Sequence, residues 1–303
     1  MTVLEKRISH PREHRRGTLA RGFSLLELLI VTAVLMTVLG GIVQYIAVAS
    51  QRSKIESTKV DLTQEGREFI DEFERDIHQA GYPNCRQFNN ALLCPNATTY
   101  NDHRIAAGLV SVSSTQIIFE GDVDGDGNVD SVRYQLLDSA GNPPGPGSTC
   151  PCTIQRSQVN KQDGNPLAVP PQLAPIWSQE LQNVVNSGNP AGGAVYGGGL
   201  SISGTALFHG GTVTNNAYYA AVSSFKDYPV FSAYDQFGNP VTLPQDITTA
   251  GGQAILACSV ANANCIKSIR ITINLLGSGT TGYDTKTFVR PVATLVGSGR
   301  MDN

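Results

Sequence analysis

Four aspartates lie within the nine-residue segment Asp122–Asp130, which reads DVDGDGNVD. They occupy its first, third, fifth and ninth places, and Gly127 occupies the sixth. Alternate side chains in a tight glycine turn converge, so their oxygens can surround a hard cation such as Ca²⁺. The ligand set that this spacing predicts is Asp122, Asp124, Asp126 and Asp130, with the backbone carbonyl of Asn128 as a fifth ligand.

The twelfth place of this segment departs from the calcium loop of EF-hand proteins. A bidentate Glu is usual there, whereas this chain has Arg133. The flanking residues also alternate like strands, so the segment is no true EF-hand, and we expect a weak site with a dissociation constant on the order of 10⁻⁴ to 10⁻³ M. The alternative is an acidic hairpin turn without a cation, since Asp and Gly are common in turns. Mutual repulsion of four carboxylates favours the cation.

A single acid, Glu27, interrupts the apolar run from Phe23 to Ala49. A helix over this run spans roughly 40 Å, enough to cross a hydrocarbon core of about 30 Å with some tilt. A carboxylate in a membrane costs roughly 2.5–3.5 kcal/mol at a helix centre and less near an end. Glu27 is therefore a candidate functional residue. The alternative is a side chain near the helix end that reaches up to the interface.

The residues around Glu27 resemble the class III signal of type IV prepilins and pseudopilins. The shared features are a basic leader, Gly22 before an aromatic Phe23, and Glu27 four residues later. The resemblance implies that a prepilin peptidase/methyltransferase cuts between Gly22 and Phe23 and methylates the new amine. It also implies that Glu27 pairs with the N-terminal amine of a neighbouring subunit. An acid and an ammonium in an apolar core cost less together than each does alone.

Charge and composition divide the chain into segments. The leader, residues 1–22, has a net charge of +4, which keeps the N-terminus cytoplasmic. The rest of the chain carries −7, which gives no support for nucleic-acid binding as the main role. We expect a transmembrane and polymerisation helix over 23–49, an amphipathic continuation over 50–81 and a β-rich head over 82–303. Within the head, about 187–225 is Gly-rich and is expected to be a variable surface region.

The helix is predicted to run from Phe23 to Ala80 and to end at Gly81 and Pro83. Apolar residues recur at steps of three and four in its second half, which predicts an amphipathic helix with one face on a core. That stripe consists of Leu62, Gly66, Phe69, Phe73, Ile77 and Ala80.

Beyond the helix, the sequence pattern predicts strands. The clearest alternation covers 266–275, and other strands are expected at 116–120, 132–136, 153–159 and 229–235. A last strand is expected to begin at 286–290. Residues 172–186 are expected to hold a short helix or turn that packs Trp177. The fold class is thus α+β. The order of these elements resembles the PilW-type minor pilins and, in the same places, the J-type minor pseudopilins of type II secretion. This implies a type IV pilin-like fold, a long N-terminal helix packed on a β-rich head.

Six cysteines lie beyond the apolar run, on the predicted periplasmic side: Cys85, Cys94, Cys150, Cys152, Cys258 and Cys265. An even count in an oxidising compartment favours disulfides. Short loops suggest the pairs Cys85–Cys94 and Cys258–Cys265. Cys150 and Cys152 then pair with each other, or the whole pattern is shuffled. A zinc site lacks a partnering His at ligand spacing.

No catalytic motif is present: the five histidines stand in no motif, and there is no GxSxG, HExxH or phosphate-binding Gly loop. Together with this, the resemblance implies a non-enzymatic minor pilin that primes or tips a type IV pilus for adhesion, twitching motility or DNA uptake. The resemblance implies other pilins, the peptidase and an inner-membrane assembly platform as partners. It implies a bacterial inner-membrane location before assembly and the pilus at the cell surface afterwards. The alternatives are a type II secretion minor pseudopilin and a tip adhesin whose head binds a surface ligand.

Overall fold

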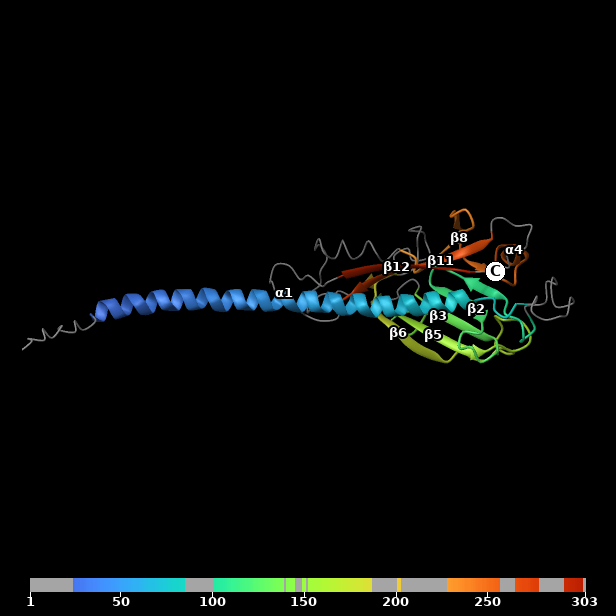
Figure 1. Ribbon diagram of the computed structural model, residues 1–303, viewed down its shortest axis with the longest axis horizontal. Helices are drawn as coiled ribbons and strands as arrows, with labels where there is room; N and C mark the ends of the chain where they lie inside the picture. The colour runs from blue at the N-terminus through green and yellow to red at the C-terminus, as the bar shows by residue number, and fades with distance from the viewer. Residues whose placement is uncertain are drawn as a thin grey trace, which may run out of the picture. The chain divides into compact units, whose positions relative to one another are not determined.

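The computed structural model describes residues 24–84, 101–138, 140–144, 149–150, 152–186, 201–202, 228–256, 265–277 and 292–301. The chain divides into two compact units, Met1–Ser50 and Gln51–Asn303. In the described residues, a long apolar N-terminal helix and a large antiparallel sheet make an α+β arrangement (Figure 1).

Helix α1, Leu25–Gln79, belongs to both units. Its part up to Ser50 is exposed throughout, and it is long and apolar enough to cross a membrane. In the second unit, the stripe predicted from the sequence is buried in full, and Ile70 and Asp76 are buried with it. The helix ends before Gly81, which has a φ of 89° and donates its N–H to the carbonyl of Glu120 at 2.8 Å.

The sheet of the second unit is antiparallel, with strand order β10-β1-β2-β3-β5-β6-β11-β8-β9 and with β12 paired to β11. Two further short strands, β4 and β7, form a separate parallel pair, and α4 is a short helix. The bounds are β1 Gly108–Val112, β2 Gln116–Gly121, β3 Asp130–Leu137, β4 Thr149–Cys150, β5 Cys152–Asn160, β6 Trp177–Val184, β7 Ser201–Ile202, β8 Phe231–Asp235, β9 Pro240–Val241, β10 Gln245–Asp246, α4 Ala250–Leu256, β11 Ile266–Leu276 and β12 Val292–Arg300.

Five of the strands expected from the sequence are present as β2, β3, β5, β8 and β11. The expected start of the last strand, 286–290, lies outside the described residues, and the last described strand is β12, from Val292. The expectation for residues 172–186 was wrong: β6 begins at Trp177, which is only half-buried. This segment is a strand because it pairs with β5, which lets it bury Leu181 and Val184 in the core.

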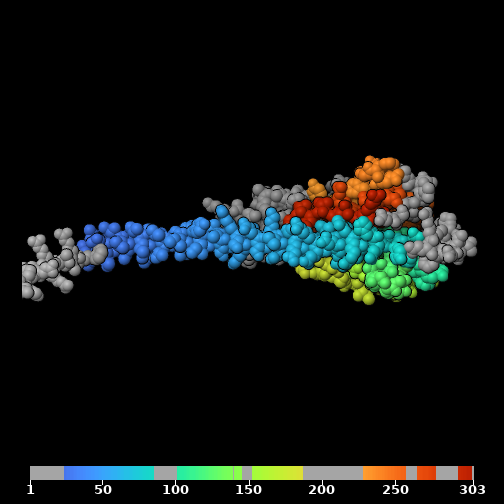
Figure 2. All heavy atoms as spheres, in the orientation of Figure 1, coloured from blue at the N-terminus to red at the C-terminus, as the bar shows by residue number. Residues whose placement is uncertain are grey.

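The core of the second unit lies between α1 and the sheet. In Figure 1 this part of α1 runs between the β11–β12 strands and the β2–β6 strands, and Figure 2 shows the same helix segment flanked on both sides by strand residues. Phe73 and Ile77 are fully buried. The ring of Tyr134 on β3 meets the edges of Phe69 and Phe73, with centroids 5.8 and 5.4 Å apart. Such edge-to-face pairs add to the stabilisation from buried area.

Glycines on the strands allow α1 to approach the sheet closely. A Cβ on Gly297 would overlap Ile70, and a Cβ on Gly299 would overlap Ile77. On the helix side, a Cβ on Gly66 would lie 2.6 Å from a methyl of Leu295. The close packing of α1 on β12 therefore depends on glycine having no side chain at these positions, and not on its backbone freedom.

A buried polar contact also joins α1 to β3 and β5. The carboxylate of Asp76 accepts a hydrogen bond from the Tyr134 hydroxyl at 2.7 Å and from Nε of Arg156 at 2.9 Å. Nη2 of Arg156 lies 2.8 Å from the same carboxylate. The side chain of Asp76 is 2% exposed and that of Arg156 is 14% exposed. Burial, and then the charge of Asp76, raise the pKa of Tyr134, which keeps its hydroxyl protonated as the donor.

Candidate functional site

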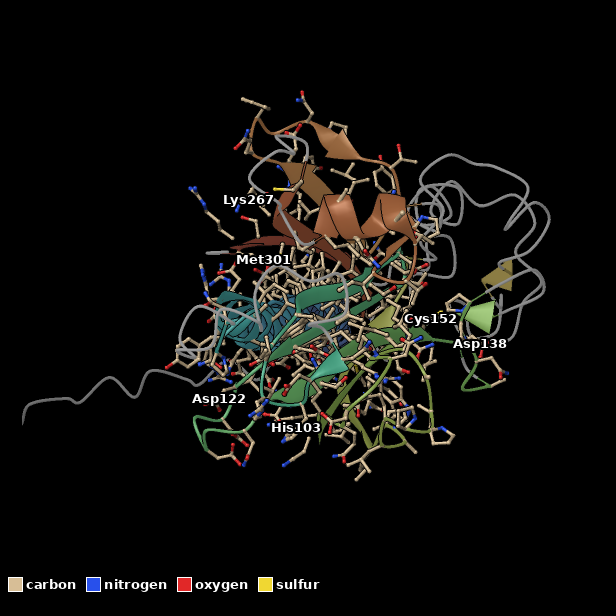
Figure 3. The ribbon with its side chains drawn as sticks, turned by 90° about the vertical axis from the view of Figure 1, so that its right-hand side faces the viewer. His103, Asp122, Asp138, Cys152, Lys267 and Met301 are labelled. Atoms are coloured by element: carbon tan, nitrogen blue, oxygen red, sulfur yellow. The ribbon has the colours of Figure 1, made fainter. Side chains whose placement is uncertain are left out.

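The aspartate-rich segment forms the loop of the β2–β3 hairpin. Gly121 pairs with Asp130 at the base of the loop. Gly125 and Gly127 have φ values of 75° and 87°, which L side chains rarely adopt, so glycine at these two places permits the tight turn. Figure 3 shows Asp122 at the start of this loop, which projects from the head.

Three of the predicted ligands come together in the loop. One carboxylate oxygen of each of Asp122, Asp124 and Asp126 lies within 4.8 Å of the other two. The carboxylate of Asp122 accepts the N–H groups of Gly125 at 2.8 Å and Gly127 at 3.1 Å. Asp124 and Asp126 are exposed. Several carboxylate oxygens at one point are the donor set that Ca²⁺ prefers, so the residues fit such an ion.

Asn128 holds the side chain of Asp126 in place within the loop. Its backbone N–H and its side-chain Nδ2 donate to the two oxygens of Asp126 at 2.7 and 2.9 Å. These bonds lower the pKa of Asp126, because they favour the ionised carboxylate. Asp126 is thereby held charged and oriented in the loop.

Asp130, the ninth residue of the segment, is buried at the start of β3. Burial first, and then the charges of Asp124, Asp126 and Asp122, raise its pKa to about 6. Gln158 on β5 donates from Nε2 to Asp130 at 2.9 Å and to Asp124 at 3.1 Å. The Gln158 amide thus joins the buried and the exposed ends of the acidic loop.

Gln158 was missed by the sequence reasoning. It is opposite Val132 in the β3–β5 register and comes from a strand far along the chain, so no local motif contains it. Arg133, at the twelfth place, lies in β3 and is buried, and its guanidinium has no oxygen to offer a cation.

Glu27 lies in the first turn of α1, with Leu26 and Leu28 exposed by 69% and 60% on either side. The N–H of Leu28 donates to the carbonyl of Ser24 at 3.1 Å, so the backbone is already helical at Glu27. Gly22 and Phe23 lie outside the described residues. The acid therefore projects from an exposed, apolar surface of the helix.

Two of the six cysteines, Cys152 and Cys265, have described side chains. Cys152 and Cys265 each take part in a disulfide. Of Cys150 only the backbone is described, in β4, and Cys85, Cys94 and Cys258 lie outside the described residues. The pairings expected from loop length therefore stay predictions.

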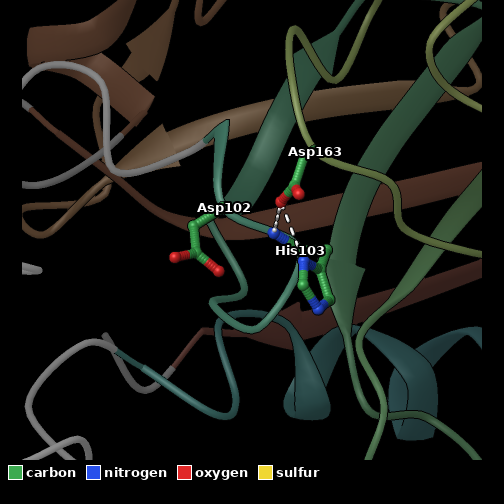
Figure 4. Close-up of side chains that lie close together, drawn as sticks. All are labelled: Asp102, His103 and Asp163. Atoms are coloured by element: carbon green, nitrogen blue, oxygen red, sulfur yellow. Dashed lines mark hydrogen bonds and ion pairs between the residues drawn. The ribbon is translucent and has the colours of Figure 1, made fainter.

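A second group of acids surrounds His103 (Figure 4). Nδ1 and the backbone N of His103 lie 2.8 and 2.9 Å from Asp163. Asp102 binds Arg104 instead, and the hydrogen bond from that guanidinium is the main cause that lowers the pKa of Asp102 to about 2. Both acids thus have protein partners at the surface.

Comparison with protein-family models, with curated proteins and with solved structures gave no match.

Proposed function

We propose that this chain is a minor pilin that takes part in priming or tipping a type IV pilus, with a pilin-like helix and head. The observation that carries the proposal is the exposed apolar part of α1 with Glu27 in its first turn, directly after the Gly22–Phe23 junction. An apolar surface of this size is stable in a membrane or against other apolar helices. The inner membrane supplies the first environment, and a filament core of similar helices supplies the second.

Glu27 favours the association of this helix with the same helix of a neighbouring subunit. After cleavage the new α-amine of Phe23 is a cation at the start of the same apolar segment. A carboxylate on one subunit and an amine on its neighbour each cost less when they pair than when they stay alone in an apolar core. The pair also sets the axial position of one helix against the next, since apolar contacts alone allow sliding.

Processing is tested by mass spectrometry of the assembled protein. The expected N-terminus is Phe23 with an N-methyl group, and Gly22→Leu should leave the leader attached. Assembled protein that still carries residues 1–22 would rule out the prepilin assignment.

The role of Glu27 is tested by incorporation into filaments. Glu27→Ala should insert in the membrane at least as readily as the wild type, because a buried acid is costly there. Its amount in sheared filaments should fall strongly. The matched control is Glu56→Ala, which removes an exposed acid of the same helix beyond the apolar run. Equal incorporation of Glu27→Ala and Glu56→Ala would refute the pairing role.

Two other functions share these features and remain alternatives. A type II secretion minor pseudopilin would have the same helix and junction, and deletion of the gene would then block protein secretion and leave pili intact. A tip adhesin would bind a surface ligand through its head, with residues 187–225 as the variable part. A glycan and host-cell binding screen of the head addresses that function.

We also propose that the β2–β3 loop binds Ca²⁺ weakly. The supporting observations are the convergence of Asp122, Asp124 and Asp126 and the raised pKa of Asp130 beside them. Burial and then repulsion from the neighbouring aspartates raise this pKa. A divalent cation would offset the repulsion, and it would join the loop more firmly to β3.

A further inference from the structure

The face of the sheet that points away from α1 carries buried charged side chains. Tyr134 of β3 contacts α1, so by strand alternation Arg133 and Ser131 point to the opposite face. Glu120 of β2 is directly opposite Ser131, and Arg133 is opposite Ile118. Glu120, Ser131 and Arg133 therefore share one small area of that face.

Only one of the two carboxylate oxygens of Glu120 has hydrogen-bond partners in the described structure. One oxygen, Oε2, accepts from Nζ of Lys161 at 2.6 Å and from the backbone N of Ala107 at 2.9 Å. Lys161 also donates to the carbonyl of Ile105 at 2.7 Å, and both charged side chains are 0% exposed. The other oxygen of Glu120, Oε1, is buried and has no hydrogen-bond partner in the described structure.

Its neighbours on this face carry unmatched groups as well. Among the described residues, Nε and Nη2 of Arg133 are buried without a partner, and so is Oγ of Ser131. Nε and Nη2 form one edge of the guanidinium, a pair of parallel donors that fits a single acceptor region. Glu120 acts electrostatically on Arg133, so the two charges are close, yet they make no ion pair within 4.0 Å. Buried polar groups of this kind are ordinarily matched, since leaving them unmatched is costly.

The chemistry of these atoms selects the occupant. Arg133 offers donors and needs an acceptor, whereas Oε1 of Glu120 needs a donor. An anion would satisfy Arg133 but would be repelled by Oε1, and a metal cation would satisfy Oε1 but would be repelled by Arg133. Water both accepts and donates, and Ser131 can do either.

We infer that Glu120, Ser131 and Arg133 form a site for ordered water that bridges Oε1 of Glu120 to the guanidinium of Arg133. The water completes a network that already contains Lys161. That network joins β2 and β3 directly below the acidic loop, and it reaches the segment 105–107 through the backbone of Ile105 and Ala107. Such waters are integral parts of folded proteins when they have two to four polar partners. This inference does not depend on the proposed function.

The test is a crystal structure of the full chain in detergent, at a resolution that shows ordered water, together with a second crystal soaked in bromide. The expected result is water density within hydrogen-bond distance of Oε1 of Glu120 and of Nε or Nη2 of Arg133. Bromide should give no anomalous peak there. A bromide peak at Arg133, a direct Glu120–Arg133 bond, or a site without density would each overturn the inference.

Thermal unfolding of variants gives a second, independent readout. Arg133→Met keeps the length of the side chain but removes the donors, so its melting temperature should fall by several degrees. Arg104→Met is the control, because Arg104 lies at the surface. Equal melting of the two variants would count against a bridged network at Arg133.

Discussion

Replacing Asp76 by alanine should destabilise the head more than any other single charge removal on α1. Asp76 is 1% exposed, and it accepts hydrogen bonds from both Tyr134 and Arg156. In Asp76→Ala the hydroxyl of Tyr134 loses its acceptor, and the guanidinium of Arg156 loses the carboxylate that lies 2.8 Å away. Arg156 then stays largely buried, and its remaining carboxylate partner is the more exposed Glu72, 3.6 Å from Nε.

The size of the effect follows from this burial. Removing one partner of a buried ion pair costs about 3–5 kcal/mol, whereas exposed pairs contribute about 1 kcal/mol or less. For a head of this size, each kcal/mol shifts the melting temperature by about 2–4 °C, so Asp76→Ala should melt about 6–20 °C lower. Asp76→Asn keeps an acceptor for Tyr134 but no charge for Arg156, and it should fall between Asp76→Ala and the wild type.

The assay is thermal unfolding of the full chain in detergent, followed by near-ultraviolet circular dichroism, which reports the packing of Tyr134. Asp71→Ala is the control, because Asp71 is exposed on the same helix and its removal should change stability by about 0.5 kcal/mol or less. Adding Arg156→Met to Asp76→Ala should restore part of the loss, since it removes the buried cation that Asp76 no longer neutralises. If Asp76→Ala melts like Asp71→Ala, the contact does not hold α1 on the sheet.

Three further outcomes are expected. Gly299→Ala should cost about 1–3 kcal/mol in unfolding experiments, because the new methyl group overlaps Ile77, whereas Gly41→Ala meets nothing within 4 Å and should melt like the wild type. Millimolar Ca²⁺ should raise the melting temperature by a few degrees at most relative to EGTA, and Asp124→Ala should remove the difference; equal melting in both buffers would leave the turn without a cation. Without Ca²⁺, the free energy of unfolding should fall as the pH rises from about 4 to about 6. The pKa of Asp130 is about 6 in the folded state against an ordinary value of 3.8, so between these values the folded state binds a proton that the unfolded state does not. Asp130→Asn should abolish that fall, and calorimetric Ca²⁺ affinity of the wild type should weaken below pH 6, where the ion competes with a proton.

The periodic parts of the fold could be predicted from the sequence. The stripe from Leu62 to Ala80 is buried as its spacing indicated, because one face of an amphipathic helix has to find a core. The alternation at 266–275 likewise marks β11, whose central residues Ile269, Ile271 and Ile273 are fully buried. In both cases the spacing of apolar residues within one segment is enough to predict which side chains are buried.

The contacts between distant segments could not be predicted in the same way. β6 is a strand because β5 and β11 lie beside it, and its own residues around Trp177 show no regular alternation. Asp76 is the only acid in α1 that is buried, yet its local sequence looks like that of its exposed neighbours. Its partner Arg156 lies 80 residues further along the chain, so only the folded sheet brings the two together.

The acidic loop shows the same limit within one site. Its aspartates could be found from spacing, because a turn brings alternate residues together locally. Gln158 could not, since its position beside Asp124 and Asp130 depends on the register between β3 and β5.

The glycines of β12 also bear on how the protein would respond to mechanical tension. Ile70 and Ile77 of α1 occupy the space above Gly297 and Gly299, where any side chain would collide with them. The helix therefore cannot slide along the strand without lifting these isoleucines over neighbouring residues. Tension along α1 would pass into β12 and then into its nine paired positions with β11, a long antiparallel ladder. Under load, α1, β11 and β12 would therefore resist unfolding together.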